Sequence, residues 1–179
     1  MHGYPPHIDA IEFARREQEI VGEFNVHRFQ RLLEGLPRQP DSSMVQYKLI
    51  GSRGLDGSPR LSLSVQANVV LECQRCLGDL GLDIDHQVTL ELVRQESELD
   101  QDDLEDDDPD APEKILGSPK FDVGELIEDE LILEVPYVPK HEACTVDATV
   151  SAEGSADPPE AAQRPSPFAV LGQLKAKSK

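Results

Sequence analysis

Tryptophan is absent from this 179-residue sequence, aromatic residues make up only 4% of it, and apolar residues of all kinds make up 38%. This apolar fraction is low for a compact domain, and together with 14 prolines it indicates that part of the chain lies outside a packed core. No stretch approaches the roughly 18 to 20 consecutive apolar residues of a membrane helix. We therefore expect one domain and no contact with a membrane.

Basic residues are also scarce: the sequence has 17 Lys and Arg but 35 Asp and Glu, which gives a formal charge of −18. Most of the excess lies in residues 95–147, which hold 3 basic and 19 acidic residues. Polyphosphate repels a globally acidic chain. Any nucleic-acid contact must therefore use local basic patches or an intermediary protein.

Several catalytic motifs are missing as well. The sequence contains no phosphate-binding glycine loop, no dinucleotide fingerprint, no serine nucleophile elbow and no metalloprotease helix. We therefore predict no catalytic residues, no enzyme activity and no small-molecule substrate. Three cysteines are an odd number, and no apolar leader precedes them, so we expect a reducing, cytoplasmic location rather than a disulfide framework.

What the sequence does contain is two strongly alternating segments on either side of Cys73-Gln74-Arg75-Cys76. Period-two alternation is typical of half-buried antiparallel strands, so the two cysteines are predicted at the turn of a long hairpin. The first strand is unusually long, and we expect a bend or bulge at Val70, where the alternation breaks. The alternating apolar-side positions are Leu61, Leu63, Val65, Ala67, Val69 and Leu71, then Leu82, Ile84, His86, Val88, Leu90 and Leu92.

Three further elements complete the predicted fold. Residues 44–50 alternate like a strand, residues 26–35 form an apolar helical face after a cap at Asn25, and residues 122–134 form the clearest helix. The carboxylates of that last helix are interpreted as a solvated face: Glu128, Asp129, Glu130 and Glu134.

These elements predict an α+β fold, in which packing helices cover an antiparallel sheet built on the long hairpin. The single domain is expected over 1–147, with an acidic loop at about 95–114. Ten of the fifteen residues from Glu96 to Asp110 are acidic, so this segment is either a solvated loop or has a charge-mimic or regulatory role against a basic partner. Residues 148–179 are predicted to be a flexible linker and a basic C-terminal tail. The apolar turn of that tail either docks on the domain or binds a partner.

Soft metal ligands occur in two close pairs, Cys73 with Cys76 and His141 with Cys144. Structural zinc commonly takes four nitrogen or sulfur ligands from two such pairs, so zinc is the candidate cofactor. His86 is a competing fourth ligand or a partly buried structural histidine. Two other interpretations remain open, namely thiols that bind nothing and a redox Cys-x-x-Cys. The antiparallel flanks argue against the redox interpretation, because reactive pairs of that kind begin a helix.

Four segments have a distinctive combination of residues in the same order along the chain: 71–77 (LECQRCL), 121–133 (FDVGELIEDELIL), 138–144 (VPKHEAC) and 167–175 (PFAVLGQLK). Together they resemble the bacterial YceD family, also called the large ribosomal RNA subunit accumulation protein. The resemblance implies a cytoplasmic, non-enzymatic protein needed for synthesis, processing or stability of 23S rRNA, and so for large-subunit assembly. Some members have a fuller second cysteine pair where this chain has His141 and Cys144, which implies a zinc-knuckle origin with the metal either kept or lost in this chain.

Two hypotheses about partners follow. In the first, the protein binds 23S rRNA or a large-subunit precursor particle; in the second, it is an adaptor whose acidic segment shields a basic ribosomal protein. Arginines at 28, 31 and 38 gather on one side of the predicted helix 26–35, where they form either a solvated face or a contact with RNA or protein. The candidate contact residues are Arg28, Arg31, Arg38, Arg75, Lys175, Lys177 and Lys179.

Overall fold

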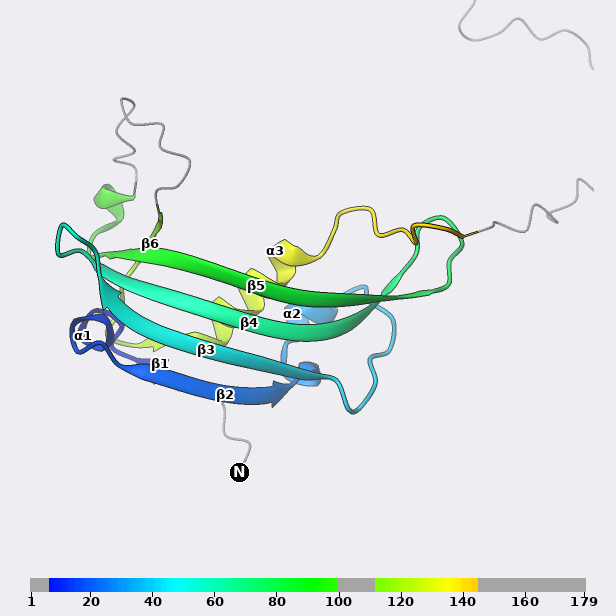
Figure 1. Cartoon of the computed structure of the whole chain (residues 1–179), viewed down its shortest axis with the longest axis horizontal. Coiled ribbons are helices and arrows are strands. Elements are labelled where there is room, and N and C mark those ends of the chain that lie inside the picture. Colours follow the sequence, from blue (N-terminus) through cyan, green and yellow to red (C-terminus); the bar gives the residue numbers. More distant parts are fainter. Residues whose placement is uncertain (1–6, 100–111, 145–179) are drawn as a thin grey trace, which may run out of the picture. The chain divides into compact units, whose positions relative to one another are not determined.

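The computed structural model describes residues 7–99 and 112–144 (Figure 1). The predicted C-terminal tail with Lys175, Lys177 and Lys179, and most of the predicted acidic loop, lie outside these residues. The elements are β1 (His7–Ile8), α1 (Ala10–Arg15), β2 (Glu19–Asn25), a 3₁₀ turn (Val26–Arg28), α2 (Gln30–Leu33), β3 (Met44–Arg53), β4 (Pro59–Glu72), β5 (Asp79–Val93), a second 3₁₀ turn (Glu96–Glu98), β6 (Glu113–Leu116), β7 (Phe121–Asp122) and α3 (Val123–Glu134).

The strands form one five-stranded sheet in the order β2-β3-β4-β5-β6, beside a small β1-β7 pair. All neighbours in the large sheet are antiparallel except β5 and β6, which are parallel. Helices α1 and α3 pack on β3, β4 and β5, and α2 packs on α3. This arrangement confirms the α+β class and the central hairpin.

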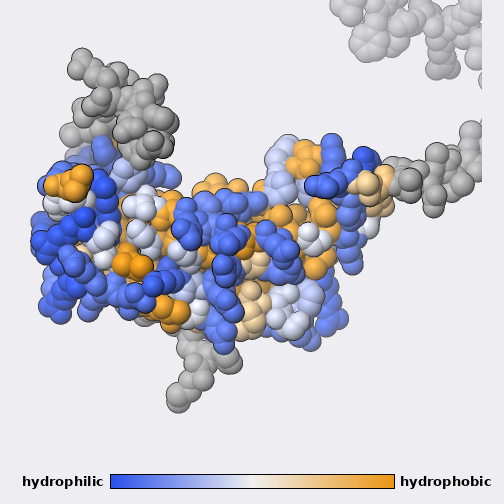
Figure 2. Space-filling view, in the orientation of Figure 1, coloured by the Kyte–Doolittle hydropathy of each residue, from blue (hydrophilic) through white to orange (hydrophobic). Residues whose placement is uncertain are grey.

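The two faces of the sheet differ as the alternation predicts. The inner face is buried under the helices, with Leu49, Leu63 and Val69 at most 1% exposed. The outer face holds polar side chains such as Ser62 and Thr89, whose hydroxyls lie 3.2 Å apart, and Figure 2 shows this side as largely hydrophilic. Among the described residues, no helix is long and apolar enough to cross a membrane.

The predicted bulge at Val70 is wrong. Pairing between β4 and β5 runs without interruption from Arg60 opposite Glu91 to Glu72 opposite Asp79, and the long strands curve smoothly instead (Figure 1). Val70 lies beyond the last residue of β4 that pairs with β3. The side chain of Gln39 fills that place, because its amide accepts from the N–H of Val70 and donates to its carbonyl, both at 2.8 Å.

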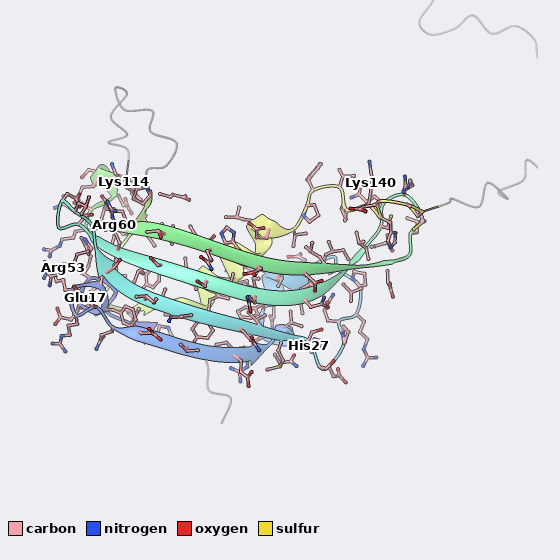
Figure 3. The ribbon with its side chains drawn as sticks, viewed as in Figure 1. Glu17, His27, Arg53, Arg60, Lys114 and Lys140 are labelled. Carbon is pink, nitrogen blue, oxygen red and sulfur yellow. The ribbon has the colours of Figure 1, made fainter. Side chains whose placement is uncertain are left out.

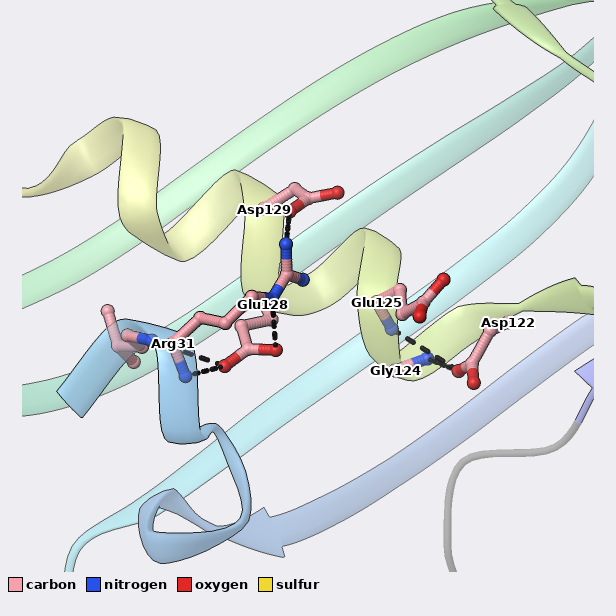
Figure 4. A network of polar contacts seen from close by, with 7 residues as sticks. Arg31, Asp122, Gly124, Glu125, Glu128 and Asp129 are labelled. Atoms are coloured by element: carbon pink, nitrogen blue, oxygen red, sulfur yellow. Dashed lines mark hydrogen bonds and ion pairs between the residues drawn. The ribbon is translucent and has the colours of Figure 1, made fainter. Parts of the chain in front are cut away.

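The predicted continuous helix over 26–35 is also wrong. The chain forms a 3₁₀ turn at Val26–Arg28 and then the single turn of α2, with Phe29 between them at φ −92° and ψ 82°. Asn25 does cap the first turn, by accepting from the N–H of His27. A tertiary contact stabilises the break, since Glu128 of α3 accepts the N–H of Arg31 at 2.7 Å, one of the amides left without a partner at the start of α2 (Figure 4).

Helix α3 begins where the sequence predicts, because the Asp122 side chain accepts from the N–H groups of Gly124 and Glu125 (Figure 4). Its acidic residues do not form one solvated face, however. Glu130 is only 8% exposed and lies 3.2 Å from Nε2 of His86 on β5. Burial raises the pKa of Glu130, and the adjacent His86 offsets only part of that rise.

Replacing Gln39 with Met should lower the free energy of unfolding by about 2 kcal/mol, because the backbone groups of Val70 lose their only partners on the β3 side within the described chain. Gln46→Met, on the exposed face of β3, should change it by less than about 0.5 kcal/mol. Urea denaturation of both variants measures the difference. Equal effects would show that the Gln39 amide does not replace strand pairing.

Candidate metal centre

The turn between β4 and β5 is a tight loop that holds two of the cysteines. The N–H of Cys73 donates to the carbonyl of Gly78 at 2.9 Å, and the N–H of Leu77 donates to the carbonyl of Cys73 at 2.8 Å. Leu77 adopts a positive φ of 59°, an uncommon conformation for a residue with a side chain. The loop thus directs Cys73 into the buried interior and leaves Cys76 half-buried beside it.

The second pair of ligands arrives on the chain that follows α3. Helix α3 stops at Val135, which is extended at φ −71° and ψ 119° because Pro136 follows it. The chain then lies against the hairpin turn, where the N–H of Gln74 donates to the carbonyl of Pro139 at 2.9 Å. This contact places His141 and Cys144 next to the two hairpin cysteines.

One ligand atom from each of the four residues lies within 4.8 Å of the others. The sulfurs of Cys73 and Cys144 are 3.9 Å apart, and the Cys76 sulfur is 3.4 Å from Nδ1 of His141. Tetrahedral zinc, with bonds of about 2.3 Å to sulfur and 2.0 Å to nitrogen, separates its ligand atoms by about 3.5 to 3.8 Å. The Cys₃His cluster is therefore compatible in composition and spacing with a zinc site, as the sequence predicts.

The histidine is oriented for this role by a group that sequence analysis missed. Nε2 of His141 lies 3.0 Å from the main-chain carbonyl of Asp79, an acceptor. That hydrogen bond places the ring proton on Nε2. Nδ1, which faces the cysteines, then carries the lone pair that can bind a metal ion. A carbonyl has no signature in the sequence, so only the fold reveals it.

The local backbone also shifts the pKa values of the cysteine thiols. Burial raises the pKa of Cys73, but N–H groups of His141, Cys76 and Arg75 that donate to its sulfur outweigh burial, and the pKa falls to about 5. For Cys76 a backbone bond from Gly78 lowers the pKa, but burial and the two neighbouring cysteines raise it overall. The N–H groups that donate to Cys73 favour its thiolate, the form in which a cysteine binds metal.

Arg75 connects the two halves of the cluster. Its Nε donates to the Cys144 sulfur at 2.8 Å, and a terminal nitrogen donates to the carbonyl of His141 at 2.9 Å. The guanidinium therefore balances the negative charge that thiolates concentrate here. Its predicted role in RNA or partner contact stays a prediction, on a side chain that already has these two partners.

The other predicted residues are not part of the Cys₃His cluster. His86 is held between Glu130 and Glu134, with Nδ1 2.8 Å from Glu134, so it is a structural histidine and not a fourth ligand. The arginines of 26–38 have surroundings that differ from one to the next. Arg28 lies 5.5 Å above the ring of Phe24, Arg31 binds Glu128 and Asp129, and Arg38 is exposed.

Replacing Arg75 with Met should loosen the contact between the hairpin turn and the 139–144 segment, because two hydrogen bonds are lost. We expect amide hydrogen exchange at Gln74 to accelerate on the order of tenfold, and exchange at Val65 in the middle of β4 to stay unchanged. Arg38→Met is the control, since Arg38 is exposed and has no side-chain partner among the described residues. Unchanged exchange at Gln74 would contradict this role of Arg75.

Comparison with known proteins assigns this chain to a family. The family model described as large ribosomal RNA subunit accumulation protein YceD matches residues 61–175, a range that contains all four ligands. A protein of that name from Haemophilus influenzae is 33% identical over 184 residues, which cover 97% of each chain. No solved structure matches significantly. The chain therefore belongs to the YceD family.

Proposed function

We propose that this protein is a non-enzymatic, cytoplasmic factor that supports accumulation of 23S rRNA and assembly of the large ribosomal subunit. The observation that carries the proposal is the match to the YceD family over 61–175, together with 33% identity to a protein of that name across almost the whole chain. The family name refers to accumulation of the large ribosomal RNA subunit, which supports a role connected with that RNA. The partner is then 23S rRNA or a precursor particle that contains it.

The physical role that we propose for the Cys₃His cluster is structural. Zinc bound there joins the turn of the β4–β5 hairpin to the chain after α3, which are otherwise held by hydrogen bonds such as that from Gln74 to Pro139. Such a site contributes its binding energy directly to folding. The pKa of Cys73, lowered to about 5, favours the thiolate form that binds zinc.

Zinc binding is testable with a matched pair of histidine variants. Protein purified without chelator should contain about one zinc per chain by atomic emission. His141→Gln should lose most of that metal, whereas His86→Gln should keep it, because His86 binds Glu130 and Glu134 outside the cluster. Wild-type protein free of metal, or equal loss in both variants, would rule out this site.

The functional proposal is tested by sedimentation of a tagged full-length protein on sucrose gradients of cell lysate. We expect it in fractions that contain large-subunit precursors, and we expect depletion of the protein to lower 23S rRNA relative to 16S rRNA. Protein that stays at the top of the gradient, with 23S rRNA unchanged on depletion, would contradict the proposal.

The adaptor hypothesis makes a different prediction. It relies on the acidic excess of residues 95–147 and predicts binding to a basic ribosomal protein with no binding to RNA. Affinity purification of the tagged protein from ribonuclease-treated lysate separates the two, because a directly bound ribosomal protein stays with it after the RNA is digested.

A further inference from the structure

Three arginines from separate parts of the chain meet at the end of the sheet opposite the cysteine cluster. Arg15 ends α1, Arg53 ends β3 and Arg94 follows the last residue of β5. All three line one hollow of about 420 Å³. Figure 3 shows Arg53 at this end of the sheet, near Arg60 and Lys114 and far from Lys140. At about 3.3 Å per residue, the 14 residues of β4 separate this site from the cysteines by roughly 40 Å.

Nearby acidic groups are mostly occupied by other partners. Glu91, which also lines the hollow, binds Arg60 at 3.1 Å. Among the described residues, the side chains of Arg15 and Arg94 form no ion pair or hydrogen bond, and Arg53 donates only to the carbonyl of Arg15, at 2.7 Å. Glu98 is the one carboxylate of this hollow without a cationic partner in the described chain. Among the described residues, three arginines and two carboxylates therefore line this hollow, and Arg60 offsets the charge of one of the carboxylates.

A second hollow, of about 370 Å³, adjoins the first, because Arg15 and Arg94 line both. Its acidic residues are occupied too: Asp9 caps α1 through the N–H of Glu12, and Glu12 binds Arg16 at 2.7 Å. The two hollows have Arg15 and Arg94 in common, so these two side chains border more surface than a single anion covers. The planar guanidinium matches the geometry of phosphate oxygens, and several cations that line one hollow raise the local concentration of anions.

We propose that Arg15, Arg53 and Arg94 form a binding site for successive phosphates of an RNA backbone. The inference rests on the proposed function in that the polyphosphate is ribosomal RNA. It explains how a chain with a formal charge of −18 contacts RNA, through a local site at the α1 end of the sheet. The site is distinct from the arginines at 28, 31, 38 and 75, of which Arg31 and Arg75 are already held by partners within the chain.

The test measures binding of the full-length protein to labelled 23S rRNA fragments by fluorescence anisotropy across a salt series. The triple variant Arg15→Gln, Arg53→Gln, Arg94→Gln should bind about tenfold more weakly or worse near 100 mM salt. Its slope of log affinity against log salt should be shallower by about 2 to 3, because three phosphate contacts are lost. The control variant Lys48→Gln, Lys120→Gln, Lys140→Gln removes the same charge from exposed residues outside the two hollows and should weaken binding less than about threefold.

A second variant guards against a folding defect, since Arg53 also holds the carbonyl of Arg15. Arg94→Gln, whose side chain has no partner in the described chain, should leave the melting temperature unchanged and still reduce the salt slope by about 1. Inorganic phosphate at matched ionic strength should not displace the RNA. Displacement by millimolar phosphate would identify a free-phosphate site and overturn the assignment to RNA.

The inference is overturned if both triple variants weaken binding equally, or if the wild-type protein binds these RNAs without salt dependence. Its failure is distinguishable from failure of the proposed function. Sedimentation with large-subunit precursors and normal RNA binding by the arginine variant would overturn this site alone. Absence from the precursor fractions, with 23S rRNA unchanged on depletion, would instead contradict the proposed function.

Discussion

Antiparallel pairing between β4 and β5 is the interaction on which the rest of the structure depends. The pairing runs in one register from Arg60 to Glu72, so a shift of one residue would move every buried side chain of the strand to the polar face. That single register places Leu63 and Val69 beneath the helices and Ser62 on the polar outer face. It also sets where the hairpin turn lies, and hence where Cys73 and Cys76 meet the chain after α3.

The two ends of this hairpin carry different chemistry. At the turn, thiols, a histidine and Arg75 bring together segments more than sixty residues apart, and this end is built for structural stability. At the other end, Arg53 is the last residue of β3 and Arg94 follows the last residue of β5. Neither side chain forms an ion pair with a carboxylate of the described chain. The separation matters because a substitution at one end leaves the contacts of the other end intact.

Charge is organised locally although the chain as a whole is acidic. Several carboxylates have structural roles within the chain. Glu128 accepts the N–H of Arg31 at the start of α2, Glu130 is buried beside His86, and Glu91 forms an ion pair with Arg60. An ion pair such as Glu91 with Arg60 contributes little to attraction or repulsion of a distant partner, because its two charges offset each other. The net charge of −18 therefore governs repulsion of polyanions at a distance, whereas arginines without a partner in the described chain, such as Arg94, govern the local potential at contact.

Local signals in the sequence are sufficient to predict the long hairpin, helix α3 with its cap at Asp122, and the four candidate soft ligands. Each of these depends on periodicity, capping or spacing within a few residues. Three other features are visible only in the folded chain: Glu128 stabilises the break in the helix predicted at 26–35, Gln39 replaces strand pairing at Val70, and the carbonyl of Asp79 orients His141. The fold also brings Arg15, Arg53 and Arg94 together. These contacts join residues far apart along the chain, and their energy exists only once the sheet has placed both partners.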